Sequence, residues 1–241
     1  MSRLAVTIRR AALFLFAACS GVARSGDHEL TSITNQLPDV PAPPLADTWW
    51  ISKSMRMNGL PMTLKNFRSK LSPEDVCEYY RRNARVHSNS EILRRRRGPW
   101  SMLSIKSQHD LITIQVRPTP LGSEGTITVS PPPETVQLEV RTEFPRPGAT
   151  SIVNLQEFDD AGAQAEHICM TSGRSVGVEA QAFVQKLEGS GWQIIMKEPM
   201  QTVLRGQLIE AQKGAQYALL SLMPDASRPG NTGIVVVWKK S

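Results

Sequence analysis

The sequence predicts an α+β protein made of two tandem modules, each an antiparallel sheet with one helix packed on one face. A turn signal occurs twice, because Asn58-Gly59 recurs as Ala161-Gly162 at a displacement of 103 positions. A helix-start signal also occurs twice, since Ser72 recurs as Ser175 at the same displacement. After each helix start, apolar residues follow a helical period that then shortens to the period of a strand. We therefore expect each module to contain a β-hairpin, a helix and three to four further strands.

The first module begins with a predicted hairpin. Residues 49–57 and 60–69 flank Asn58-Gly59, a pair that readily supplies the positive φ angles of a type I′ turn. In this register Met57 faces Leu60 across the hairpin.

A helix is expected next. Ser72 suits the N-cap, Pro73 suits the first helical position, and Asp75 completes a capping box. Its apolar stripe consists of Val76, Cys77, Tyr80 and Ala84. Strand-like patterns then cover residues 91–97, 100–106, 111–116 and 126–129.

The second module follows the same order. Residues 151–159 and 163–172 flank the turn at Asp160-Ala161-Gly162, and a helix is expected over residues 175–188, ended by Gly189-Ser190-Gly191. Its apolar stripe consists of Val176, Ala180, Phe183, Val184 and Leu187. Strand-like patterns follow at residues 192–197, 203–211, 216–223 and 233–239. The apolar faces of the two helices coincide when 103 is subtracted, although few residues are identical.

The amino terminus indicates export. Arginines at positions 3, 9 and 10 precede an apolar run over residues 11–18 that is too short to span a bilayer. The segment Phe16-Ala17-Ala18-Cys19 resembles a bacterial lipoprotein signal, which implies lipidation of Cys19 and a mature chain that starts there. Since Ser20 follows instead of Asp, the resemblance implies a periplasmic protein anchored to the outer membrane. Ordinary cleavage after Ala23 is the alternative.

Proline-rich segments mark the expected domain boundaries. Residues 1–23 form the signal segment and residues 24–47 a Pro-rich tether. The first module is expected over residues 48–130 and the second over residues 150–241, with a Pro-rich linker at 131–149 between them.

The charge of the chain is concentrated in the first module. Residues 48–130 carry fourteen Lys and Arg against six Asp and Glu, whereas residues 150–241 carry eight against nine. The candidate binding surface consists of Arg81, Arg82, Arg85, Arg94, Arg95, Arg96 and Arg97, with Trp100 as an adjacent contact. Outside the cytoplasm its partners would be an envelope protein complex or an anionic membrane or glycan surface, not nucleic acid. Alternatively, the arginines form a solvated edge strand that resists pairing with other edges.

Metal and cofactor sites are not expected. Met55, Met57 and Met62 gather near the first turn, where thioethers could hold Cu(I), but the same spacing suits a hydrophobic sheet face. Cys77 and Cys169 are expected to be separate buried thiols, with a disulfide between them as the alternative.

The histidines do not indicate catalysis. His28, His87, His109 and His167 have no local partner at a mechanistic spacing, and no familiar catalytic motif occurs. We therefore expect a non-catalytic binding or assembly module of the cell envelope. The alternative is a periplasmic hydrolase or a metal carrier whose site combines distant residues.

Overall fold

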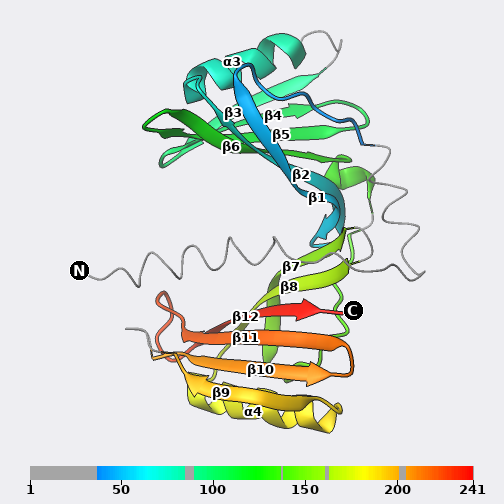
Figure 1. Ribbon diagram of the computed structural model, residues 1–241, viewed down its shortest axis with the longest axis vertical. Coiled ribbons are helices and arrows are strands. Elements are labelled where there is room, and N and C mark those ends of the chain that lie inside the picture. The colour runs from blue at the N-terminus through cyan, green and yellow to red at the C-terminus, as the bar shows by residue number, and fades with distance from the viewer. Residues whose placement is uncertain (1–36, 85–89, 137, 161–162, 201–204, 241) are drawn as a thin grey trace.

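The structure is a computed structural model that describes residues 37–84, 90–136, 138–160, 163–200 and 205–240. Within these residues the chain forms one antiparallel sheet of twelve strands, two α-helices and a short 3₁₀ helix at Pro133–Thr135 (Figure 1). The α+β class is therefore correct. The expected signal segment and the first part of the tether lie outside the described residues.

The elements of the first half are β1 (Ala46–Met57), β2 (Leu60–Ser69), α3 (Pro73–Ala84), β3 (Glu91–Arg97), β4 (Trp100–Lys106), β5 (Leu111–Thr119) and β6 (Gly122–Ser130). The elements of the second half are β7 (Thr150–Asp160), β8 (Ala163–Ser172), α4 (Val176–Gly189), β9 (Gln193–Pro199), β10 (Gln207–Lys213), β11 (Gln216–Pro224) and β12 (Thr232–Lys239). The expected strands at 91–97 and 100–106 have the observed bounds.

The two halves contribute six neighbouring strands each to a single sheet of order β3-β4-β5-β6-β2-β1-β7-β8-β12-β11-β10-β9. In each half a hairpin is followed by a helix and a four-stranded meander. The last strand of the meander pairs with the second strand of the hairpin, β6 with β2 and β12 with β8.

The expectation of a separate sheet in each module is corrected by the pairing of β1 with β7. Three residue pairs join them, among them Met55 with Phe158. The turn residue Asn58 extends this pairing, because its backbone N–H donates to the Leu155 carbonyl and its side-chain Oδ1 accepts from the Leu155 N–H, both at 2.8 Å. These contacts satisfy backbone groups next to the first turn that two separate sheets would leave unpaired.

Both helices lie on the same side of the sheet, which we call the helix side. Phe67 of β2 packs in the core under α3, and Leu155 of β7 packs in the core under α4. Side chains alternate along a strand, so Met62 and Phe158, each an odd number of residues away, point to the opposite side, here called the open side. Their strands are joined through Met55, which packs with both of them. In Figure 1 the helices therefore occupy the two ends of the long axis, outside the bent sheet.

The first hairpin has the expected turn and register. Asn58 and Gly59 both have positive φ, 52° and 82°. Met57 pairs with Leu60 and Met55 with Met62, as the two-residue turn predicts. The methionine cluster is the apolar contact between the halves, packed against Phe158.

The two helix starts differ in detail. The Ser72 Oγ accepts from the Asp75 backbone N–H at 3.1 Å, which is the serine half of the expected capping box. The Asp75 carboxylate accepts from the Ser72 hydroxyl at 2.7 Å, in place of the Ser72 backbone N–H that the full box requires. Ser175 is the N-cap of α4 by its extended backbone, but its side chain makes no capping hydrogen bond.

The described part of the expected tether is not a free spacer. Residues 37–45 pack along the helix side of the first half, where Val40 is buried and the Tyr80 hydroxyl donates to the Pro41 carbonyl at 2.8 Å. The buried Lys65 ammonium binds Asp39 at 2.6 Å and the Val40 carbonyl at 2.7 Å. A proline-rich composition indicated extension, whereas the few apolar side chains between the prolines decide that the segment docks.

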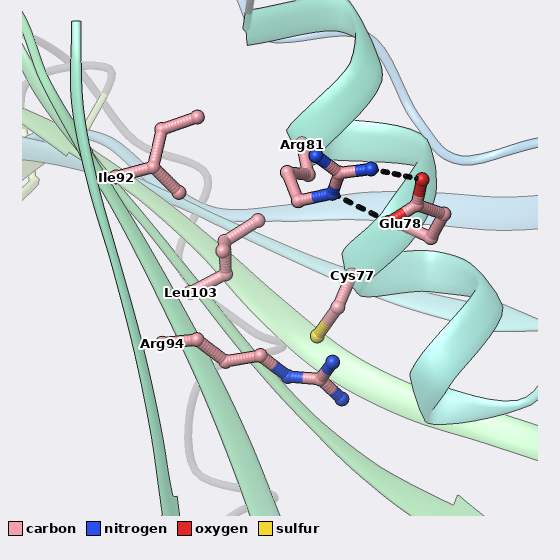
Figure 2. A pocket seen from close by; sticks show the side chains of 6 residues that line it. All are labelled: Cys77, Glu78, Arg81, Ile92, Arg94 and Leu103. Atoms are coloured by element: carbon pink, nitrogen blue, oxygen red, sulfur yellow. Dashed lines mark hydrogen bonds and ion pairs between the residues drawn. The ribbon is translucent and has the colours of Figure 1, made fainter.

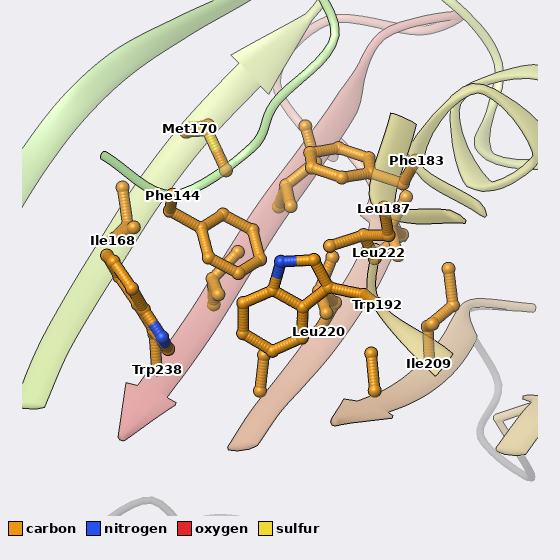
Figure 3. Packing of buried hydrophobic residues seen from close by; sticks show 14 of the residues in the cluster. Phe144, Ile168, Met170, Phe183, Leu187, Trp192, Ile209, Leu220, Leu222 and Trp238 are labelled. Carbon is orange, nitrogen blue, oxygen red and sulfur yellow. The ribbon is translucent and has the colours of Figure 1, made fainter. Parts of the chain in front are cut away.

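The expected linker is docked as well. Its residues 142–149 precede β7 as residues 37–45 precede β1, and we call these two stretches the leading segments. Phe144 is buried beside Trp192 and Trp238, with ring centroids 5.8 and 5.5 Å away (Figure 3). Farther up the linker, Glu139 lies against the first turn, where a Cβ added to Gly59 would come within 2.6 Å of its backbone.

Candidate functional site

Strand β3 is one of the two edges of the sheet and carries Arg94 to Arg97. All seven of its residues pair with β4 on one flank, including Arg94 with Leu103 and Arg95 with Met102. Because Leu103 belongs to the core under α3, Arg94 and Arg96 point to the helix side and Arg95 and Arg97 to the open side. The single basic surface expected from the sequence is thus divided between two faces, and we call the four arginines the basic edge.

The two described arginines of α3 are held by one acid. Arg81 binds the Glu78 carboxylate through two nitrogens at 2.6 Å each, and Arg82 binds it at 2.7 Å. These hydrogen bonds and the arginine charges lower the pKa of Glu78 to about 2. The spacing of three and four residues is the helical ion-pair pattern, a signal that the sequence contained but that was not used. Arg85 lies outside the described residues.

A hollow of about 280 Å³ opens between α3 and the first two strands of the meander (Figure 2). Its lining consists of Cys77, Glu78, Arg81, Ile92, Arg94 and Leu103. In Figure 2 the Arg94 side chain extends from β3 beneath the Cys77 thiol, while Ile92 and Leu103 project between strand and helix. The hollow therefore has apolar walls and charged groups at its border.

The position of α3 explains the hollow. Helix α3 packs mainly on β4, β5 and β6, whereas α4 packs on β9, β10 and β11 and so covers its own edge strand. The helix side of β3 is left open by this shift of one strand. Burial raises the pKa of the Cys77 thiol, a rise that the nearby Arg94 charge opposes and Glu74 adds to. The hollow thus favours an uncharged thiol.

The open side of this edge carries a second basic group. Trp100 pairs with Arg97, and the Arg117 guanidinium lies 4.9 Å from the centroid of the Trp100 ring. Arg117 also binds the Glu124 carboxylate, with its Nε 2.9 Å from Oε1. Trp100 is therefore a stacked platform next to Arg97, and Arg117 was not anticipated from the sequence.

The other candidate residues remain apart from this edge. His109 is exposed in the turn between β4 and β5, and His167 lies on β8, where burial lowers its pKa. Cys77 and Cys169 are free thiols in different halves, and burial raises the pKa of both. His28 and His87 lie outside the described residues. Among the residues that are described, no group of three or more His, Cys, Asp and Glu side chains is placed to hold a metal ion.

In the described part of the chain, neither helix has the length and apolar character needed to cross a bilayer. Comparison with known protein families, with curated proteins and with solved structures finds no match to this chain.

Proposed function

We propose that this protein is an exported, lipid-anchored component of the cell envelope that acts by binding an acidic protein partner through the basic edge. The observation that carries the proposal is the position of Arg94 to Arg97 on a free edge, where none of them forms an ion pair with a described residue. Arg81, Arg82 and Arg117, by contrast, are already paired with Glu78 or Glu124. Unpaired cations on an edge are the groups that an acidic partner can neutralise.

The cellular location in this proposal is inferred from the first nineteen residues. Their resemblance to a lipoprotein signal supports a lipid on Cys19 and a periplasmic location at the outer membrane. Metabolic labelling of cells with a fatty-acid probe, followed by purification of the protein, tests whether Cys19 carries a lipid. A Cys19→Ala protein should then carry no label and should leave the membrane fraction.

We also propose that the two halves are tandem copies of one unit. The common strand order supports this, as do Ser69 and Ser172, which are buried at equivalent ends of β2 and β8 and each accept from the N–H two residues later. Val40 and Phe144 each lie six residues before the first strand of their half, a displacement of 104. The hairpin turns are displaced by 103, so the first half has one more residue than the second between these two points. That residue lies in β1, which has two register shifts against β2, whereas β7 has one against β8.

The proposed binding is tested by affinity purification from crosslinked cells. Replacing the basic edge, Arg94 to Arg97, by serine should remove the captured partner, while replacing it by lysine should retain much of the capture because the charge remains. A control variant with serine at four exposed cations of the second half loses the same charge elsewhere: Lys186, Arg205, Arg228 and Lys239. An unchanged partner list with the serine variant would refute the proposal.

The same variants test the alternative that the arginines serve only to keep the edge soluble. Loss of charge from an exposed edge strand would then cause self-association. Gel filtration of the serine variant would show a shift to higher mass, with no partner lost from the monomeric fraction. A monomeric serine variant that no longer captures its partner supports binding.

A further inference from the structure

We infer that the partner binds as an extended acidic segment that adds to β3 as a thirteenth strand and places one apolar side chain in the hollow between α3 and β3. The inference rests on the proposed function and specifies its mode of binding. Three features of β3 support it, namely the flank that no described strand covers, the hollow beside it and the sign of its charge.

The free flank supplies the backbone contacts. The ladder between β3 and β4 runs from Glu91 with Lys106 to Arg97 with Trp100, without a register shift. A regular strand paired on one flank presents alternate N–H and C=O groups on the other. Addition of a partner strand to such an edge is a common mode of peptide recognition. Seven residues are the length of an ordinary strand, so a short segment suffices to cover the edge.

The hollow supplies a place for a side chain. Alternate residues of an added strand would point to the helix side, next to Ile92 and Arg94. The apolar wall there is formed by Ile92, Leu103 and Cys77, and the volume of about 280 Å³ is ample for an aliphatic side chain. At the opposite edge, α4 packs on β9, and the side chain of Lys197 reaches back to Gln181 of the helix at 3.2 Å. The edge at β3 is therefore the one with an open pocket for a neighbouring residue.

The charge selects the kind of partner. An acidic segment would place carboxylates against Arg94 and Arg96 on one side or Arg95 and Arg97 on the other. A second copy of β3 would instead bring arginine rows together, and like charges across a strand pair are destabilising. The β9 edge of a second copy offers one lysine and one glutamate, Lys197 and Glu198, and ends at Pro199. Neither edge of a second copy matches the basic edge, which favours a different, acidic chain.

The probe is a capped, dye-labelled nonapeptide of alternating Glu and Val, titrated with the full-length protein and followed by fluorescence anisotropy. We expect saturable binding that weakens as salt is raised and that is lost in the Arg94 to Arg97 serine variant. A peptide of the same sequence with alternate backbone nitrogens methylated keeps its charge but cannot complete a ladder, so it should bind at least about tenfold more weakly, a change of about 1.4 kcal/mol.

A matched pair of variants tests the hollow without changing the charge. Ile92→Trp fills the hollow and should weaken peptide binding about tenfold, equal to about 1.4 kcal/mol. Leu93→Trp places the same ring on the open side of the neighbouring position, where Leu93 is already exposed, and should leave the affinity unchanged. Far-UV circular dichroism and the thermal midpoint show that both variants fold, and Ile92→Phe repeats the test with a smaller ring.

The outcomes separate the mode of binding from the function itself. Equal binding of the methylated peptide would overturn strand addition, and equal effects of the two tryptophan variants would overturn occupation of the hollow. Absence of peptide binding, or binding only to vesicles of anionic phospholipid, would overturn the inference as a whole. If capture from cells still depended on the basic edge in any of these cases, the proposed function would stand and only its mode would be wrong.

Discussion

The two halves of the sheet fasten their leading segments by different chemistry. In the first half, polar groups hold the leading segment in place: Lys65 binds Asp39 and the Val40 carbonyl, and the Tyr80 hydroxyl donates to the Pro41 carbonyl. In the second half, Phe144 packs against Trp192 and Trp238. Lys65 and Ile168 lie at equivalent positions of β2 and β8, 103 residues apart, so one strand order accommodates a buried ammonium in one half and an aliphatic side chain in the other.

The halves also differ in how they treat their edges. Helix α4 reaches its edge strand, whereas α3 is shifted inward and leaves β3 with an open hollow and four arginines. The half whose helix reaches its edge strand is also nearly neutral, and the half with the open edge carries the charge. A core can therefore be kept while the packing and charge around one edge change, which makes an edge a suitable place for a new function.

The comparison of leading segments is tested most strongly by truncating their anchors. Phe144→Ala should lower the free energy of unfolding by about 3–5 kcal/mol, since it empties a buried aromatic site. Val40→Ala removes far less buried surface and should cost about 1.5 kcal/mol. Urea unfolding followed by tryptophan fluorescence measures both. A larger loss for Val40→Ala would mean that the polar contacts depend on this small anchor.

The junction between the halves is tested at Asn58. Asn58→Ala leaves the Leu155 N–H without its acceptor and places alanine at a positive φ, for a total of about 2–3 kcal/mol. Asn58→Asp retains an oxygen acceptor and a residue type that tolerates this conformation, so it serves as the control. Chemical denaturation and amide exchange at Leu155 report the change. Equal stability of the alanine variant would show that the strand pairs alone join the halves.

A buried acid in the second half provides the next test. Glu179 is fully buried in the first turn of α4, where Oε2 accepts from the Ser172 hydroxyl and Oε1 has no hydrogen-bond partner among the residues that the structure describes. The equivalent residue of α3 is Val76, also fully buried. An orphan oxygen costs about 1–3 kcal/mol, more than the 0.3–1 kcal/mol that an acid near a helix start contributes. Glu179→Val also removes the acceptor of the Ser172 hydroxyl, which offsets part of the gain, so the variant should be more stable by at most about 1 kcal/mol. Thermal unfolding measures the sign, and a loss of stability would indicate a partner for Oε1.

The smallest effect concerns His167, whose equivalent in the first half is Leu64. Burial lowers the pKa of His167 below its ordinary value of 6.5. The unfolded chain then takes up a proton first, so stability present above pH 6.5 is lost as the pH falls through the folded pKa. His167→Gln and His167→Phe should both flatten this part of the stability profile by a fraction of a kcal/mol. Denaturation at several pH values measures it, and unaltered profiles would contradict the assignment.

Local signals made much of the fold predictable. The Asn-Gly turn, the capping serine at position 72 and the alternation in β4 are each determined by residues close in sequence. The pairing of β1 with β7 had no such signal, because it joins residues about a hundred positions apart through backbone groups that any sequence supplies. Docking of the leading segments was missed for a related reason, since one apolar residue among prolines shows nothing of the pocket that receives it.

The candidate site was predictable in composition but not in geometry. The four arginines and Trp100 indicated a basic strand, and the strand is an edge. The placement of Arg94 and Arg95 on opposite faces of the sheet follows from strand periodicity alone, so it is contained in the sequence. The hollow could not be predicted from the sequence, because it depends on how far α3 is displaced across the sheet. That displacement is set by packing between distant elements.

The strand order has a consequence for where each edge is presented. The chain enters the sheet at β1 and leaves it at β12, and both strands are in the interior of the ribbon. From β1, five steps across β2, β6, β5 and β4 lead to β3, which at the usual spacing of strands is a reach of about 24 Å. In a molecule that is attached through the chain preceding β1, the basic edge would therefore lie on the far side of five strand spacings from β1, away from the point of attachment.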